Sequence, residues 1–137
     1  MARGSYKIIL PQVARNISEA ATQAFQATAT ECANRIIDRT PVKTGLARGN
    51  TQIAINTAEM SATGTLDPDG GTARTRAAGV AQLLKIGDAA VIGNPLDYVE
   101  ALENGSSSQA PAGMYGLTEQ EVPRIWDREF RGAMEQG

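Results

Sequence analysis

The sequence of 137 residues contains no histidine and only one cysteine, Cys32. The absence of histidine removes the residue on which the common zinc sites and many general-base mechanisms depend. One cysteine excludes an intrachain disulfide, and we interpret Cys32 as a small buried residue of a helix. We therefore assign no catalytic residue, no metal ligand and no cofactor-binding residue.

Aromatic residues, net charge and long apolar runs are also scarce. Much of the apolar content is alanine and aromatic residues make up only 4%, so we expect a thin core in a lone monomer. A formal net charge of −2 gives no overall attraction to nucleic acid or to an anionic membrane. No apolar run reaches the roughly 18 residues of a membrane span, and the start lacks a signal-like segment. We expect one domain, residues 1–137, that stays in the cytoplasm unless it travels in an assembly.

The first third of the chain is predicted to be one long helix. Residues 1–10 read as a leader, with Ile8, Ile9 and Leu10 as an apolar anchor before Pro11. Residues 11–39 then repeat apolar and small side chains at spacings of three and four, which predicts a helix about 40 Å long that packs on a sheet. Packing on a neighbouring subunit as well is a hypothesis. The repeating residues are Val13, Ile17, Ala20, Ala21, Ala24, Thr28, Cys32 and Ile36, widened by Phe25 and Ile37.

The helix is predicted to end near Arg39, because the Thr40-Pro41 step disfavours helical backbone. The loop that follows contains two glycines and the basic residues Lys43 and Arg48. It lacks the glycine and lysine spacing of phosphate-binding loops, so we interpret it as a connector.

The middle of the chain is predicted to hold two strands separated by a long loop. Residues 50–57 alternate apolar and polar side chains, and residues 89–94 form a second apolar strand bounded by turn signals. Residues 58–79 show no period and are expected to be an exposed loop, with Arg74 and Arg76 near its tip. The apolar cluster of residues 80–86 fits a short helix or the end of a strand, and we favour the strand.

The last third is predicted to contain a short helix, a loop and a longer helix. Residues 97–105 fit the short helix, residues 106–116 a second exposed loop, and residues 118–136 the C-terminal helix. Thr118 and Glu121 match a capping box, although Pro123 can instead mark a later first turn. The predicted apolar face is Val122, Ile125, Trp126, Phe130 and Met134, with Trp126 either in the core or at an interface.

Two motifs, in this order, carry a resemblance to a known family. The first is Arg39-Thr40-Pro41-Val42-Lys43-Thr44-Gly45-Leu46-Ala47-Arg48-Gly49-Asn50. The second is Tyr98 with Ala101-Leu102-Glu103-Asn104-Gly105-Ser106, followed by Gln109-Ala110-Pro111-Ala112-Gly113-Met114. Flanked by helices, they resemble the tail-completion proteins of tailed bacteriophages, the minor tail protein Z-like group. The first motif is one position shorter than the family pattern between Gly45 and Leu46, and residues 66–79 have no counterpart.

The resemblance implies an α+β fold, in which a long N-terminal helix and a C-terminal helix pack on a small antiparallel β-sheet with long exposed loops. It also implies a structural virion protein at the head–tail junction, in a ring expected to be hexameric that completes the tail and joins it to the head. The implied partners are copies of itself and the neighbouring tail-terminator, tail-tube and head-closure proteins, with DNA passing through the lumen without specific binding. The candidate subunit or partner contacts are Lys43, Arg48, Arg74, Arg76, Ser107, Gln109, Met114 and Trp126.

Three alternatives remain open at this stage. A different neck component, such as the tail terminator or the head-closure ring, shares the setting but not the motifs. A carboxylate-dependent hydrolase requires Glu100 and Glu103 in a cleft with a raised pKa. A nucleic-acid-binding module requires the basic residues Lys43, Arg48, Arg74 and Arg76 to converge.

Overall fold

The computed structural model describes residues 10–136, with side chains from residue 17 onward. Helices packed on a two-stranded antiparallel sheet confirm the predicted α+β class. The predicted leader, apart from Leu10, and the side chain of Val13 lie outside what the structure describes. The elements in order are α1 (Leu10–Arg39), α2 (Leu46–Gly49), β1 (Gln52–Ile55), α3 (Gly71–Ala81), β2 (Ala90–Gly93), α4 (Val99–Glu103) and α5 (Tyr115–Gln136).

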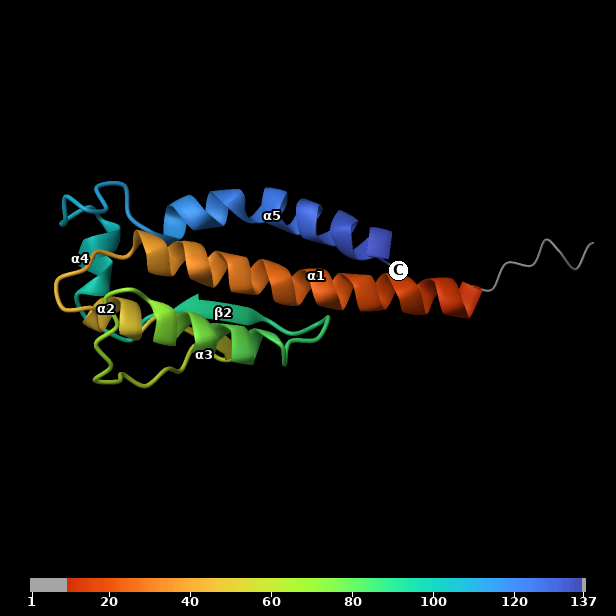
Figure 1. The fold of residues 1–137 in the computed structure, drawn as a ribbon, viewed down its shortest axis with the longest axis horizontal. Coiled ribbons are helices and arrows are strands. Elements are labelled where there is room, and N and C mark those ends of the chain that lie inside the picture. Colours follow the sequence, from red (N-terminus) through yellow and green to blue (C-terminus); the bar gives the residue numbers. More distant parts are fainter. Residues whose placement is uncertain (1–9, 137) are drawn as a thin grey trace, which may run out of the picture.

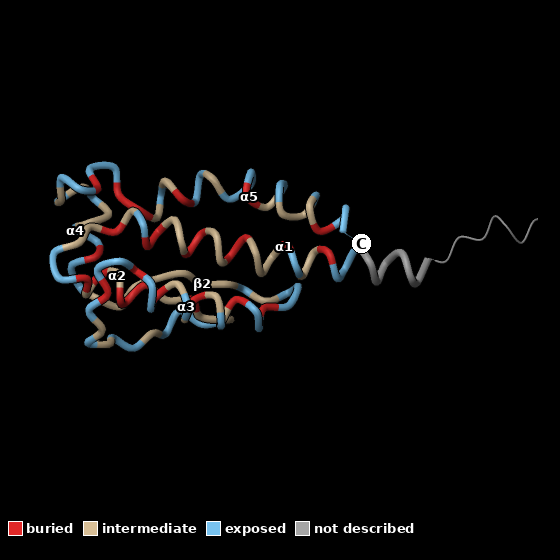
Figure 2. Tube along the Cα trace, viewed as in Figure 1, coloured by how far each residue is buried: buried red, intermediate tan, exposed pale blue. Residues whose placement is uncertain are grey.

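Helix α1 is the axis of the fold. Its 30 residues span about 45 Å, with Pro11 in the first turn and the end at Arg39, as predicted. Helix α5 runs along one side of α1, while α3 and the sheet lie on the other side (Figure 1). The tube in Figure 2 accordingly shows buried positions recurring along α1. None of the described helices has the length and apolar character needed to cross a membrane.

A core built from small residues joins α1, α3 and the sheet. Ile53 of β1 pairs with Ile92 of β2 in the antiparallel register, and both contact this core. Leu84, fully buried, closes it after the end of α3. The remaining buried members are all alanines, which let the two helices approach closely: Ala29 and Ala33 of α1, and Ala77 and Ala81 of α3.

Helix α3 corrects the prediction that residues 58–79 are one long loop. Only residues 58–70 are non-helical there, and the strand favoured for residues 80–86 is replaced by the end of α3 and a turn. Ala73, Ala77 and Ala81 recur every four residues and are each at most 1% exposed. A spacing of four residues is typical of a helix. Alanine, however, is only slightly more apolar than the neighbouring threonines and glycines, so the pattern is hard to recognise in the sequence. The helix is stabilised by burial against α1, which its local sequence does not reveal.

Helix α5 begins three residues before the predicted start. Thr118 lies inside it and donates its hydroxyl to the Met114 carbonyl at 2.9 Å, while Glu121 pairs with Arg39. The predicted capping box is therefore wrong, and so is the alternative that Pro123 marks the first turn. Of the predicted apolar face, Ile125 is buried, but Val122 and Met134 are exposed.

Candidate interaction site where the two motifs meet

The two motifs quoted above lie together at one end of the molecule, around the C-terminal end of α1, α2 and α4 (Figure 1). A second core holds this end together, and its buried members are Ile36, Val99, Ala110 and Met114. Two segments that are far apart in the sequence, one ending at Asn50 and the other beginning at Tyr98, are thereby placed side by side.

The first motif makes a tight turn between α1 and α2. The Thr40 amide donates to the Ile36 carbonyl at 2.9 Å, which closes the last turn of α1. Gly45 then adopts φ +88° at the start of α2, and its carbonyl accepts the Asp67 amide at 3.0 Å. A Cβ at position 45 would come within 2.4 Å of the Pro68 nitrogen. Glycine is required here by both backbone conformation and space.

Arg48 fastens this turn to its surroundings. Its guanidinium donates to the carbonyls of Thr40 at 2.9 Å, Pro68 at 2.8 Å and Asp38 at 3.1 Å. Three carbonyls on two different segments are thus satisfied by one planar cation, a geometry that lysine cannot reproduce. Arg48 stabilises the fold and presents little free donor capacity to a partner.

The second motif places a carboxylate at the N-terminus of α5. Glu103 accepts the backbone amides of Met114 at 2.9 Å, Tyr115 at 2.8 Å and Gly116 at 2.9 Å. Burial opposes ionisation of Glu103, but the amides of Gly116, Tyr115 and Met114 outweigh it and hold the pKa of Glu103 below its usual value. The helix dipole acts in the same direction. Glu103 is therefore the N-terminal cap of α5, supplied by a different helix.

One side chain of the second motif connects directly to the first. Gln109 accepts the Val42 amide at 2.9 Å and donates its own amide to the Val42 carbonyl at 3.0 Å. This two-bond clasp pairs both backbone groups of Val42, as a neighbouring strand would.

Val42 and Gln109 border an open hollow of about 440 Å³. Its size is within the range of clefts that accept small groups, roughly 300–1,000 Å³. Its lining combines apolar side chains with a lysine and several uncharged polar side chains. The lining residues are Pro41, Val42, Lys43, Thr44, Gly45, Leu46 and Ala47 of the first motif, and Tyr98, Leu102, Ser107 and Gln109 of the second.

Of the eight candidate contact residues, the structure brings three together in the hollow: Lys43, Ser107 and Gln109. The prediction that Met114 contacts a partner is wrong, because Met114 is 0% exposed in the second core and presents no surface to a partner. Trp126 is half-buried on α5 and stacks on Phe130, with ring centroids 5.5 Å apart. As interaction contacts, the seven residues other than Met114 stay predictions.

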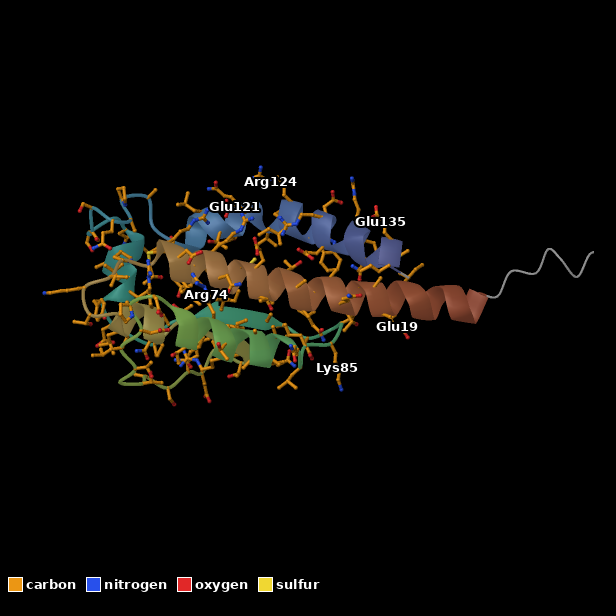
Figure 3. All side chains as sticks on the ribbon, viewed as in Figure 1. Glu19, Arg74, Lys85, Glu121, Arg124 and Glu135 are labelled. Carbon is orange, nitrogen blue, oxygen red and sulfur yellow. The ribbon has the colours of Figure 1, made fainter. Side chains whose placement is uncertain are left out.

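The arginines of α3 do not reach the hollow. Arg74 forms an ion pair with Asp38 of α1 and points toward that helix in Figure 3. Arg76 donates to the carbonyls of Gly49 and Thr51, each at 2.8 Å. Three of the four basic residues proposed to converge on a nucleic acid are thus bound within the chain, leaving Lys43 exposed.

No protein-family model, no curated protein and no solved structure matches this chain. The resemblance to tail-completion proteins therefore depends on the two motifs alone.

Sequence reasoning missed Tyr98 and Leu102 as surface residues of the site. They are four residues apart on one side of α4, and both line the hollow. Both occur in the second motif, but neither is among the eight candidate contacts. Tyr98 is 46% exposed, which is high for an aromatic residue of a motif.

The described residues offer little to support chemistry at this site. Glu100 is exposed on α4, while the Glu103 carboxylate is fully engaged by amides and has a lowered pKa. A general acid in glycoside hydrolysis needs a raised pKa. Within residues 10–136, no group of three or more histidine, cysteine, aspartate or glutamate residues is arranged to hold a metal ion.

An ion-pair network joins α5 to α1 beside this site. Arg39 donates two hydrogen bonds to the Glu121 carboxylate, at 2.6 and 2.9 Å, and one to Thr118 at 2.8 Å. Arg35 lies 3.2 Å from the same carboxylate. The hydrogen bonds from Arg39, aided by Arg35 and opposed by burial, lower the pKa of Glu121 to about 2.

This network predicts a pH-dependent contribution to stability. A carboxylate with a lowered folded-state pKa stabilises the fold above its ordinary pKa of 4.5, and this contribution is lost as the pH falls through the folded value of about 2. Glu121→Gln should therefore melt at a lower temperature than wild type at neutral pH. The difference should shrink between these two pH values.

The measurement is a series of thermal unfolding curves from neutral pH to pH 2, with Glu119→Gln as control because Glu119 is exposed on the same helix. A difference in melting temperature that stays constant over this range would contradict the assignment.

Proposed function

We propose that this chain is a structural protein of the head–tail junction of a tailed bacteriophage, of the tail-completion kind. The observation that supports the proposal is the arrangement of the two motifs that resemble those of the family. They lie against each other around one hollow, and their polar side chains hold backbone there: Arg48 on three carbonyls, Glu103 on three amides and Gln109 on Val42.

This arrangement suits binding better than chemistry. Arg48, Glu103 and Gln109 use their polar groups to fix the shape of the surface. A hollow with both apolar and polar lining residues remains at one end of the molecule. Preorganised surfaces of this kind reduce the entropy lost on association. Repeated weak contacts of one subunit with its neighbours are then strengthened by ring closure. In the proposed ring, the loops of one copy become ordered when they contact adjacent copies and the next ring of the neck.

The other classes receive less support. The hydrolase alternative requires a carboxylate with a raised pKa, and Glu103 has the opposite shift. The nucleic-acid alternative requires free arginines, and Arg48, Arg74 and Arg76 all have partners within the chain. Between the tail-completion protein and another neck ring, the motifs favour the former.

The test of this function is the protein's place in the particle and the effect of its loss. In purified virions of the phage that encodes it, we expect labelled copies of this chain at the junction of head and tail. Disruption of its gene should leave DNA-filled heads and separate tails that do not join, and supply of the wild-type chain should restore joining. Finished particles that lack the protein, or intact infectious particles without its gene, would reject the proposal.

A further inference from the structure

The end of α3 opposite the hollow carries an exposed apolar tip, residues 82–88. Leu83 is 67% exposed and Ile86 is 51% exposed, both high values for branched aliphatic side chains. Figure 3 labels Lys85 of this tip at the end of α3 remote from α2 and α4, where the hollow lies. The layer formed by α3 and the sheet therefore has an apolar projection at one end and the hollow at the other.

The tip is held rigidly in spite of its exposure. Leu84 is fully buried between Leu83 and Ile86 in the sequence. Gln26 of α1 donates to the carbonyls of Gln82 at 3.1 Å and Leu84 at 2.9 Å. Asp88 accepts the Lys85 amide at 2.9 Å and the Asn56 side chain at 3.0 Å. A fixed turn that displays two aliphatic side chains is preorganised for insertion.

The charges at the two ends are complementary. Lys85 is exposed at the tip, and Asp97 is exposed next to Tyr98, which lines the hollow. No ion pair among the described residues uses Lys85 or Asp97. Lys43 at the hollow is the one cation of the lining, and Asp88 is the acid of the tip. Both ends therefore present a charge that the other can pair.

We propose that Leu83 and Ile86 of one copy of this chain insert into the hollow of the next copy. Lys85 then faces Asp97, and Asp88 faces Lys43. Because the tip and the hollow are different surfaces, the contact is heterologous, and its repetition closes a ring or extends a filament according to the rotation per copy. This inference rests on the proposed ring and names the surfaces that build it.

The decisive experiment mixes two variants that are each blocked at one end. Leu83→Asp blocks the tip and Ser107→Trp fills the hollow, so neither chain can form a series of contacts alone. The Leu83→Asp chain keeps its hollow and the Ser107→Trp chain keeps its tip. An equimolar mixture is therefore expected to form dimers and nothing larger, while each variant alone is monomeric in analytical ultracentrifugation. Each blocked contact should weaken association at least about tenfold.

Matched controls separate the contact from general effects. Val122→Asp introduces the same charge on α5, away from both ends, and Ser108→Trp places the same ring on an exposed neighbour outside the lining. Both should associate like wild type. Circular dichroism melting curves check that every variant is folded.

A second measurement covers weak association of the free chain. Chains with Ile86→Cys and chains with Ser107→Cys, tagged to differ in mass, are mixed and oxidised. The disulfide between the two kinds of chain is expected to exceed the disulfides within each kind. Cys32 is buried and remains as a common background.

Several results would overturn the proposal: larger assemblies of either blocked variant, a mixture that stays monomeric, or cross-links without excess between the two kinds of chain. These outcomes are distinct from failure of the proposed function. If the tip pairs with the hollow but the protein lies elsewhere in the particle, the proposed function is rejected and the proposed contact stands. If the protein lies at the head–tail junction but the tip and hollow do not pair, the contact is rejected and the function stands.

Discussion

Gly45→Ala is expected to lower the free energy of unfolding by about 2–5 kcal/mol. A residue with a Cβ pays roughly 1–2 kcal/mol for left-handed backbone, and overpacking adds about 1–3 kcal/mol. The new Cβ would meet backbone atoms at 2.4 and 2.6 Å, from Pro68 and Asp67. Those atoms cannot move freely, because Arg48 binds the Pro68 carbonyl and Asp67 caps α3 through the Ala73 amide at 2.8 Å.

Gly87→Ala is the matched control for this change. Gly87 also has a positive φ, +100°, but a Cβ there has no neighbour within 4 Å. Gly87→Ala should therefore lower the free energy of unfolding only by the cost of left-handed backbone, about 1–2 kcal/mol. Urea unfolding of both variants measures the difference, and equal losses at positions 45 and 87 would show that the contact with residues 67 and 68 carries no energy.

Glu103→Gln is expected to lower the free energy of unfolding by about 2 kcal/mol, which is the scale of hydrogen bonds to a charged group. The substitution removes the charge and turns one acceptor into an NH₂ group that faces an amide donor. The α5 N-terminus then keeps an unpaired N–H. Glu100→Gln on the same helix is the control, and an exposed change of this kind should stay within about 0.5 kcal/mol.

The loss at position 103 should also depend on pH in a defined direction. The pKa of Glu103 is lowered in the folded state, so its contribution is present above the ordinary carboxyl pKa of 4.5 and disappears as the pH falls through the lowered value. Urea unfolding of wild type and Glu103→Gln at neutral and acidic pH measures this. A Glu103→Gln variant as stable as wild type at neutral pH would contradict the capping role.

The parts of the fold that could be predicted are those with strong local signals. The end of α1 follows from Thr40-Pro41, because proline restricts the backbone before it. The two strands follow from alternation and turn residues, and both were placed within a few residues. The N-terminus of α5 could not be predicted, since its cap is supplied by Glu103, eleven positions before Met114. A capping box at Thr118 was the nearest local signal, and it was misleading.

The candidate site shows the same division. The two motifs lie together around the hollow, but the roles of their side chains depend on tertiary contacts that sequence does not give. Met114 was expected at a partner surface, and the structure buries it in a core. Arg48 binds backbone carbonyls, and its role as a partner contact stays a prediction. Tyr98 and Leu102 were not among the expected contacts, and they line the hollow. Arg48 and Glu103 fix the shape of the surface through hydrogen bonds to backbone groups, while Tyr98 and Leu102 form part of the surface itself.

The lone cysteine gives this fold a built-in reporter. Cys32 is 4% exposed on α1, close enough to Arg35 and Glu121 to experience their charges, and burial raises the pKa of its thiol. A thiol reagent can reach it only when the packing around this part of α1 opens. The labelling rate of the unmodified protein therefore counts such openings, without any introduced probe.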